Sequence, residues 1–410
     1  MRESRLLGAD LVRATACLMV LVHHLVQRLD LNTLPEWLWP AYGFGLMGSF
    51  GVASFFILSG FLLARPFWQA LDAGEPMPSL RVYGVRRAAR IVPGFWLALT
   101  ATFVLSLVVF DVPLTQLLVT RYLAGLFLVS EWHWSTLFPV EYNGPLWSIA
   151  FEVSSYIFLP ICLALLFWVR PAGVWGRRLI WVAIIGLVLL IHWLIVRFLP
   201  IDRSMSGWEY GLVGGANTWV PRFNPVGFFA IFAIGALAAG VQVRIARLRS
   251  PALDLAAVLG VAIAIWSMLS YEFGNSEGTG PAGIPYGFPV FPLGVALILV
   301  ALPSSWLLGR LAENRPTMFI ARISFGVYLW HYLIIELIRQ LAVPEFAQRN
   351  VESVPLWLAL SAVVFLLSVA VTSASFYWLE RPVMRWARGL EQPRPIVAAS
   401  LTEPSSLHRS

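Results

Sequence analysis

The sequence contains no lysine and little charge of any kind: all 29 basic residues are arginine, and charged residues make up 12% of its 410 residues. An average soluble domain carries about 25% charged residues. With hydrophobic residues at 59%, so few charges cannot cover a water-facing surface, which excludes a soluble globular protein and a disordered chain. The arginines form small scattered groups and no continuous stripe, so we expect no nucleic-acid partner. The composition indicates an integral membrane protein.

Cysteine is scarce as well. Cys17 and Cys162 lie inside apolar runs, so the sequence predicts neither a disulfide framework nor a metal site. The N-terminal stretch begins like a secretory signal peptide, with early arginines and an apolar core, but Asp10, Arg13 and two histidines interrupt that core. No clean small-residue cleavage site follows it. We therefore expect this stretch to be retained as the first transmembrane helix.

Apolar stretches long enough to cross a bilayer recur along the chain, and a spanning helix needs about 20 mostly apolar residues. The candidate spans are Leu7–Val26, Phe44–Leu63, Ile91–Phe110, Leu146–Trp168, Leu179–Phe198, Phe223–Val241, Leu253–Ser270, Phe288–Leu308, Phe319–Ile338 and Leu356–Leu379. An eleventh stretch, Leu114–Val129, is shorter and contains Arg121. We predict an all-α integral membrane protein with about ten transmembrane helices.

The distribution of arginine predicts the topology. If Leu114–Val129 does not span and the N-terminus is cytoplasmic, 21 of the 29 arginines fall in cytoplasmic segments. A spanning Leu114–Val129 would invert every later loop and remove this bias. The positive-inside rule therefore favours ten helices with both termini cytoplasmic, and Leu114–Val129 at the outer face or re-entrant.

The chain shows no visible internal repeat, which disfavours a transporter built from inverted halves. We expect one transmembrane domain over residues 1–388. Residues 389–410, rich in Pro and Ser, are typical of a disordered tail, here cytoplasmic. A chain without lysine is typical of a GC-rich genome, so we expect a multi-pass protein of a bacterial inner (plasma) membrane.

Polar residues inside the first predicted helix are candidates for function, because a charge at a helix centre costs roughly 2.5–3.5 kcal/mol. Arg13 and His24 share one face, with roughly 16 Å between them along the axis. Asp10 lies one turn before Arg13 and is placed to pair with it. His23 points about 100° away, so we expect it to be structural or at the lipid edge. Snorkelling of Arg13 and simple packing of His24 stay open as alternatives.

Small and basic residues occur at the cytoplasmic ends of the second and third predicted helices. In the second, Ser59-Gly60 is expected to permit close helix contact. The third begins with Arg81–Pro93, which contains four arginines. Arg86 and Arg90 are spaced i, i+4 and form one cationic face. This face is either a topology anchor or a phosphate clamp, for which the planar guanidinium is well suited.

Two later spans also carry buried polar residues. Glu152 lies one helical turn after Ser148, and a carboxylate inside the bilayer is a functional candidate. In the ninth span Tyr328 and His331 are i, i+3 neighbours, and Glu336 adds an acid near the predicted outer end.

Together these segments resemble the membrane-bound acyltransferase-3 family. The resemblance rests on an ordered set of motifs that covers nearly the whole chain: Arg-x10-His (Arg13, His24), FFILSGFLL (Phe55–Leu63), Arg-x-x-Arg with its proline (Arg87, Arg90, Pro93), Trp-Ser-x-x-x-Glu (Trp147, Ser148, Glu152), ISFGVYLWH (Ile323–His331) and SFYWLERPVMR (Ser375–Arg385). One departure is Asp10–Ala14, which lacks the two glycines that the family shows there. We also expect no long C-terminal extracytoplasmic domain of the kind that some family members carry.

The resemblance implies O-acylation, in which an acyl group passes from cytoplasmic acyl-CoA to a hydroxyl on a carbohydrate or related acceptor. No permanently bound cofactor is expected, and acyl-CoA, expected to be acetyl-CoA, serves as the co-substrate. Arginine binds phosphates through charge-assisted hydrogen bonds, and histidine is the natural general base near neutral pH. The donor-binding residues would be Arg13, Arg86, Arg87 and Arg90, and the general base would be His24.

The remaining predicted residues would assist the reaction. Glu152 would orient His24 or hold the acceptor, and Tyr328 or His331 would stabilise the developing oxyanion. Asp10, Trp147 and Ser148 would have supporting roles.

The acceptor stays open between a hydroxyl-bearing glycan, a lipid-linked sugar and a small natural product. An alternative is a proton-coupled transporter or flippase of a sugar-containing or lipid substrate, because intramembrane His, Glu and Asp also build proton relays. A non-catalytic scaffold is the third hypothesis.

Overall fold

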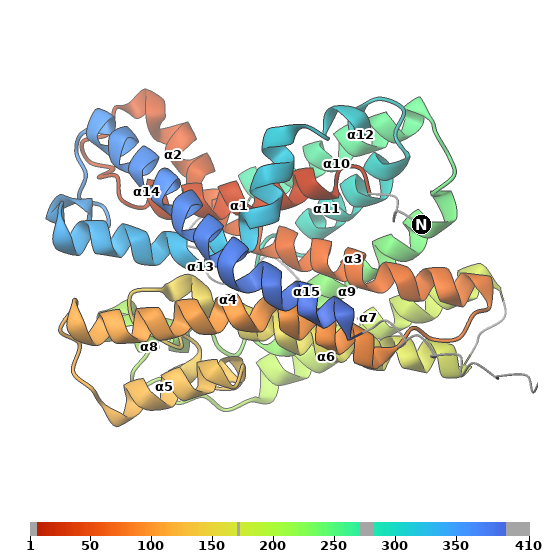
Figure 1. Ribbon diagram of the computed structural model, residues 1–410, viewed down its shortest axis with the longest axis horizontal. Helices are drawn as coiled ribbons and strands as arrows, with labels where there is room; N and C mark the ends of the chain where they lie inside the picture. The colour runs from red at the N-terminus through yellow and green to blue at the C-terminus, as the bar shows by residue number, and fades with distance from the viewer. Residues whose placement is uncertain (1–5, 170–172, 271–282, 391–410) are drawn as a thin grey trace, which may run out of the picture.

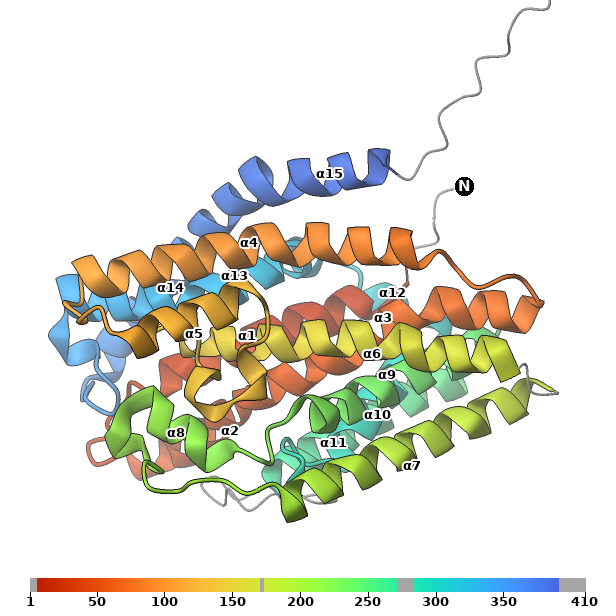
Figure 2. The same cartoon turned by 90° about the horizontal axis from the view of Figure 1, so that it is seen from below.

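The computed structural model describes residues 6–169, 173–270 and 283–390. These residues form helices and no named β-strand, which confirms the predicted all-α class. The α-helices are α1 (Ala9–Val26), α2 (Trp39–Leu46), α3 (Gly51–Ala73), α4 (Leu80–Val108), α5 (Gln116–Leu126), α6 (Trp147–Val169), α7 (Val174–Phe198), α8 (Gly211–Trp219), α9 (Pro225–Ile245), α10 (Pro251–Leu269), α11 (Val290–Ala301), α12 (Leu308–Leu311), α13 (Arg315–Leu341), α14 (Val354–Ser375) and α15 (Arg381–Gly389). The long helices run side by side along the longest axis (Figures 1 and 2).

Nine stretches within the described residues are long and apolar enough to cross a membrane. They are Ala9–Val26, Glu36–Ala73, Leu80–Val108, Gly144–Val169, Val174–Phe198, Pro225–Ile245, Pro251–Leu269, Arg315–Leu341 and Val354–Gly389. Each of them contains all or most of one predicted span. The arrangement is that of a multi-pass membrane protein.

The remaining predicted span, Phe288–Leu308, is not one long helix. Its regular part is α11, which has 12 residues and is therefore about 18 Å long, short of a bilayer core of about 30 Å. A 3-10 turn at Leu302–Ser304 follows it, with a proline at Pro303. The described residues therefore contain nine helices of spanning length, where about ten spans were predicted, and this stretch is a shorter apolar helix. Hydropathy alone does not register where the backbone leaves the α-helix.

The ambiguous stretch Leu114–Val129 contains α5, which has 11 residues. At about 16 Å it is too short to span as a straight helix, in line with its exclusion from the predicted spans. Its arginine, Arg121, is buried, pairs with Glu141 and donates from Nε to the carbonyl oxygen of Phe138 at 2.7 Å. The charge in this stretch is thus neutralised within the protein.

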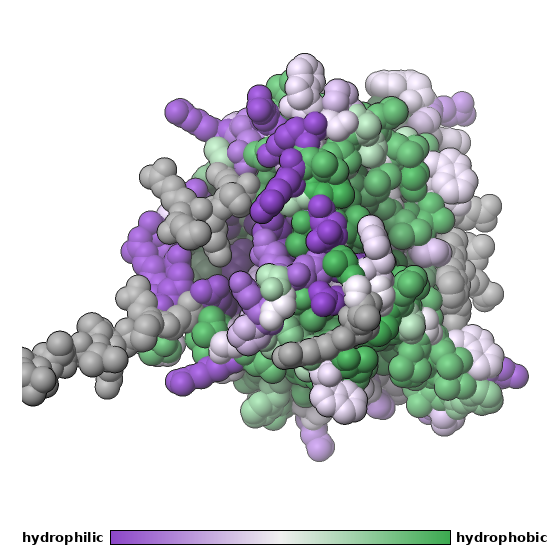
Figure 3. Space-filling model, turned by 90° about the vertical axis from the view of Figure 1, so that its right-hand side faces the viewer, coloured by the Kyte–Doolittle hydropathy of each residue, from purple (hydrophilic) through white to green (hydrophobic). Residues whose placement is uncertain are grey.

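Helix α1 begins and α15 ends at the same end of the bundle (Figures 1 and 2). Figure 3 looks onto this end, where hydrophilic side chains gather while hydrophobic ones cover much of its right and lower sides. That this end faces the cytoplasm stays a prediction. From residue 391 on, the predicted tail lies outside the described residues.

Side-chain caps start several of the long helices. Ser79, Asn224, Asn314 and Ser353 each precede a helix, and each side-chain oxygen accepts a hydrogen bond from the backbone N–H three residues later. Such a cap satisfies one of the otherwise unpaired donors of the first turn and is worth about 1 kcal/mol. These polar residues therefore mark where α4, α9, α13 and α14 begin.

Glycines allow the central helices α3 and α9 to approach closely. A Cβ atom on Gly60 would collide with the carbonyl oxygen of Phe232, and one on Gly235 with that of Ile57. Backbone contact of this kind is typical of small residues at membrane helix interfaces. The close contact expected at Ser59-Gly60 is confirmed.

The C-terminal end of α1, which carries His24, is held by several contacts. Trp357 Nε1 donates to the carbonyl oxygen of Leu25 at 2.8 Å, and the backbone N–H of Val351 donates to that of Arg28 at 2.9 Å. The Arg28 side chain is buried and forms an ion pair with Glu336 of α13 at 2.8 Å. These contacts hold the end of α1 against α13, α14 and the segment between them.

Candidate active site

A cavity of about 90 Å³ lies between α1, α3, α4, α6 and α13. It is lined by Arg13, Val52, Phe55, Phe56, Ser59, Arg90, Ile91, Ser148, Ile149, Glu152, Tyr156, Ser324, Phe325 and Tyr328. Five helices distant in sequence thus bring together five predicted site residues: Arg13, Arg90, Ser148, Glu152 and Tyr328.

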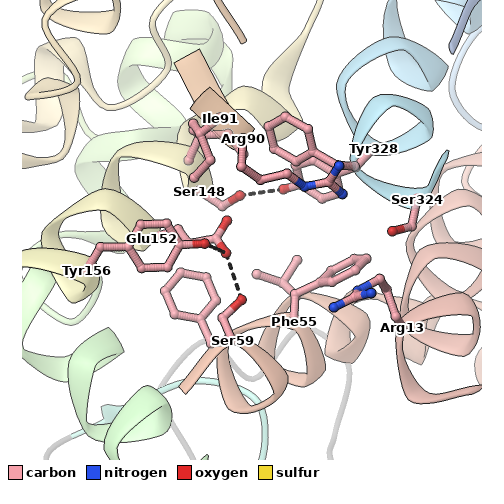
Figure 4. Close-up of a pocket in the computed structure, with 14 residues that line it drawn as sticks. Arg13, Phe55, Ser59, Arg90, Ile91, Ser148, Glu152, Tyr156, Ser324 and Tyr328 are labelled. Atoms are coloured by element: carbon pink, nitrogen blue, oxygen red, sulfur yellow. Dashed lines mark hydrogen bonds between the residues drawn. The ribbon is translucent and has the colours of Figure 1, made fainter. Parts of the chain in front are cut away.

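Glu152 is the acid of this cavity, and two hydroxyls donate to it (Figure 4). Ser59 Oγ of α3 donates to Glu152 Oε1 at 2.8 Å, and the Tyr156 hydroxyl donates to the same oxygen. Tyr156 is one helical turn further along α6, so a single helix face supplies both groups. Hydrogen bonds to a carboxylate are the strong kind, worth about 1.5–3 kcal/mol each, and they hold the acid towards the cavity.

Ser148 and Tyr328 form a second hydroxyl pair, with 2.6 Å between their oxygens (Figure 4). The Tyr328 hydroxyl also lies 2.8 Å from the carbonyl oxygen of Pro145. Ser148 Oγ lies 3.4 Å from the same carbonyl oxygen, which only accepts, so the two hydroxyls and the Pro145 carbonyl form one hydrogen-bonded group. This pair joins α6 to α13 at the wall of the cavity.

Two guanidinium groups face the cavity across from Glu152 (Figure 4). Arg13 pairs with Asp10 at 3.4 Å on the same face of α1, as its spacing predicts. Arg90 lies over the ring of Phe325, 5.5 Å from its centre. The cavity therefore presents positive charge on one side and an acid with its hydroxyl partners on the other.

Arg86 and Arg87 lie on α4, about one turn before Arg90. Arg86 is exposed, whereas Arg87 is partly buried and within electrostatic range of Arg13. Neither lines the cavity. The predicted cationic cluster thus runs from the protein surface at Arg86 to the cavity at Arg90.

His24 lies outside this cavity, in a separate group of aromatic rings. Its ring centre is 4.8 Å from that of His23, 5.2 Å from His331 and 4.9 Å from Tyr332. Its Nδ1 lies 3.1 Å from Gln27 Oε1. Of the three residues predicted to assist His24, His331 is the one beside it.

Glu152 and Tyr328 are placed differently from His331. Glu152 forms its hydrogen bonds within the cavity, with Ser59 and Tyr156. Among the described residues, no contact between Glu152 and His24 supports the prediction that Glu152 orients His24. Tyr328 lies between the two groups: it lines the cavity, and its ring centre is 6.1 Å from that of His331. A continuous series of side chains therefore leads from the cavity to His24.

His23 and Trp147 have packing environments. His23 is buried, with Nδ1 2.6 Å from the carbonyl oxygen of Leu46, so it is structural and does not lie at the lipid edge. Trp147 lies in a cluster of aromatic rings, with centres 5.4–5.5 Å from those of Phe151 and Trp219. It supports the start of α6 and does not line the cavity.

Sequence reasoning missed two residues of the cavity and one beside His24. Ser59 was interpreted only as a packing residue, although its hydroxyl donates to Glu152. Tyr156 is four residues after Glu152, a spacing that would have identified it. Gln27 has the same kind of signal, because it lies three residues after His24.

Comparison with known proteins identifies the family. The family described as an acyltransferase domain matches residues 6–373. The chain is 26% identical over 400 residues to the peptidoglycan O-acetyltransferase OatA of Listeria monocytogenes, an alignment that covers 92% of this chain and 55% of that protein. It is 23% identical over 389 residues to the O-acetyltransferase OatA of Staphylococcus aureus, over 92% of this chain and 57% of that protein.

The chain spans little more than half the length of these relatives. No solved structure matches it. The family match covers all the helices that build the cavity and the His24 group, so the resemblance seen in the motifs is confirmed. The chain belongs to the acyltransferase-domain family.

Proposed function

We propose that this chain is a membrane O-acyltransferase that moves an acyl group, acetyl in the simplest case, from cytoplasmic acyl-CoA to a hydroxyl of a glycan acceptor. The observation that carries the proposal is the path from the Arg13 cavity, past Tyr328 and His331, to His24. This series of packed side chains connects the arginine-lined cavity with the His24 imidazole. The arginines suit binding of the acyl donor, and the imidazole suits removal of the proton from the acceptor.

The donor side is the arginine cluster of α4 with Arg13. Acyl-CoA carries phosphates at one end and a thioester at the end of a long flexible arm. Arg86 and Arg87 near the surface suit the phosphates, while Arg13 and Arg90 line the cavity through which the arm passes.

The acceptor side is His24. As the acceptor oxygen attacks the thioester carbonyl carbon, His24 takes the hydroxyl proton. The carbon–sulfur bond then breaks, and the departing thiolate receives a proton, which returns His24 to its neutral form. A positioned general base contributes roughly 10²–10⁴-fold to such a reaction.

The proposed acceptor class follows from the relatives, whose names identify O-acetylation and, in the Listeria protein, peptidoglycan. A peptidoglycan-like acceptor at the outer face of a bacterial plasma membrane would meet His24 near the end of α1. The transporter alternative is not favoured, because the family match supports acyl transfer.

Coenzyme A binding tests the donor site. The protein is reconstituted in lipid nanodiscs and titrated with CoA by calorimetry. Loss of one or two charge-assisted hydrogen bonds, at about 1.5–3 kcal/mol each, predicts a roughly 10-fold or greater rise in Kd for Arg13→Ala with Arg90→Ala. Arg310→Ala, at an exposed site on α12, is the matched control and retains the wild-type Kd. Absence of CoA binding, or an unchanged Kd in the double variant, would overturn the donor assignment.

A further inference from the structure

The hydrogen bonds around His23 determine which of its ring nitrogens carries the proton. His23 Nδ1 lies 2.6 Å from the carbonyl oxygen of Leu46. A carbonyl oxygen only accepts, so Nδ1 carries the hydrogen, and in the neutral ring Nε2 is bare. Gln27 Nε2 lies 3.2 Å from this bare nitrogen and donates to it. The orientation of the Gln27 amide is thereby determined.

The same amide determines the tautomer of His24. With its NH₂ group towards His23, Gln27 presents Oε1 to His24 Nδ1 at 3.1 Å. An amide oxygen only accepts, so His24 carries its hydrogen on Nδ1 and leaves Nε2 with a free lone pair. In this tautomer Nε2 is the nitrogen that can receive the acceptor proton, whereas the other tautomer would place the lone pair on Nδ1, against Gln27.

The neighbouring histidine leaves that lone pair free. His331 Nδ1 lies 2.9 Å from the carbonyl oxygens of Val327 and Tyr328, so it too carries its hydrogen on Nδ1. Its Nε2 is buried, bare and without a hydrogen-bond partner among the described residues. Although the two rings are 5.2 Å apart, neutral His331 has no hydrogen on Nε2 to donate to His24.

We propose that Gln27 and His23 are positioning residues that hold His24 in the tautomer with a bare Nε2, a proposal that rests on His24 being the base. The relay runs from the Leu46 carbonyl through His23 and Gln27 to His24. In many enzymes a carboxylate orients the catalytic histidine. A neutral amide does so here without placing a further charge in a membrane helix.

The relay is built on backbone that is itself held in place. The Gln27 N–H donates to the carbonyl oxygen of His23 at 3.2 Å, and the Gln27 carbonyl oxygen accepts from the N–H of Arg349 at 2.9 Å. The Leu46 carbonyl comes from the last residue of α2, where the 3-10 turn Met47–Phe50 begins. Both ends of the relay therefore have defined positions, and the side chains between them have one consistent arrangement of donors and acceptors.

Nitrogen-15 NMR of histidine-labelled protein in nanodiscs tests the tautomer directly, because protonated and bare imidazole nitrogens have well-separated shifts. The chain has six histidines, and the His24 signals are assigned by their loss in His24→Gln. We expect hydrogen on Nδ1 of His24 in the wild type, and a mixture of tautomers in Gln27→Met. Gln27→Glu keeps an acceptor beside Nδ1 and retains the wild-type tautomer. Gln116→Met, at an exposed glutamine of α5, is the control.

Turnover supplies the second measurement, with acetyl-CoA as donor and isolated peptidoglycan as acceptor. Gln27→Met lowers kcat about 10-fold or more, within the roughly 10²–10⁴-fold that a base contributes, while KM for acetyl-CoA is unchanged. Hydrogen on Nε2 of wild-type His24, or a wild-type value of either the tautomer or kcat in Gln27→Met, overturns the proposal. Since the tautomer is measured without turnover, failure of the proposed function is recognised separately, as an inactive wild type.

Discussion

Replacement of Glu336 by glutamine is expected to destabilise the contact that holds α1 against α13. Arg28 Nη2 lies 2.8 Å from Glu336 Oε1, and the two side chains are 1% and 8% exposed. Glu336→Gln leaves the Arg28 guanidinium without this counter-charge where water cannot replace it. Removing one partner of a buried pair costs about 3–5 kcal/mol. Because glutamine still accepts a hydrogen bond, we expect a loss near the lower limit, about 3 kcal/mol.

Removal of both charges is expected to cost less than removal of one. Arg28→Met combined with Glu336→Met removes both charges of the buried pair, and apolar replacement of buried pairs is often neutral or stabilising. Arg339, which also bonds Glu336 at 2.7 Å, loses this partner too, but its side chain is 26% exposed, so the cost of leaving it unpaired is smaller than for Arg28. Arg28 also donates to the carbonyl oxygen of Phe346 at 3.4 Å, a long bond whose loss is small. The double variant therefore separates the effect of an unpaired charge from the effect of altered packing.

Equilibrium unfolding by denaturant in mixed micelles measures both variants. Glu345→Gln, which changes an exposed acid of the following loop, is the control and should stay within about 0.5 kcal/mol of the wild type. The reasoning is refuted if Glu336→Gln also unfolds within that margin, or if the double variant is less stable than the single one.

Three further predictions concern other parts of the structure. Tyr156→Phe removes one of the two hydrogen bonds to Glu152 and should lower the free energy of unfolding by roughly 1–3 kcal/mol, measured by denaturant titration. Gly60→Val forces a side chain against the Phe232 carbonyl and should lower the free energy of unfolding by about 1–3 kcal/mol or more. Gly186→Val, where the added side chain meets open space, should be tolerated; thermal unfolding measures both variants. Burial raises the pKa of Glu131, so the folded state holds its proton more tightly than the unfolded chain. Stability should then fall as pH rises from about 4.3 through the raised pKa, and Glu131→Gln should abolish that part of the pH dependence.

The fold was largely predictable because membrane helices leave a strong signal in hydropathy. Nine predicted spans correspond to long helices, since a chain in lipid must satisfy its backbone groups within each helix. The failure at Phe288–Leu308 has a local cause, because the 3-10 turn with Pro303 ends the regular helix early. Composition indicates that a segment is apolar but does not indicate where its backbone changes geometry.

The candidate site was predictable residue by residue but not in its grouping. Buried polar residues such as Arg13, His24 and Glu152 were conspicuous because apolar helices rarely contain them. Which of them meet depends on how α1, α6 and α13 pack, and periodicity along one helix contains no such information. The structure therefore separates Glu152 from His24 and places His331 beside His24. Ser59 was missed because its partner Glu152 lies on another helix and is identified only by a three-dimensional contact, whereas Gln27 had a spacing signal, three residues after His24.

Single-turnover acyl transfer in His24→Ala tests the central claim most directly. Enzyme in excess over radiolabelled acetyl-CoA is mixed with peptidoglycan, and the label transferred is followed together with the Kd for CoA. His133→Ala, which removes an exposed histidine, is the control. The account predicts an unchanged Kd and a rate lowered by roughly 10²–10⁴-fold in His24→Ala. Transfer by His24→Ala at the wild-type rate would contradict it.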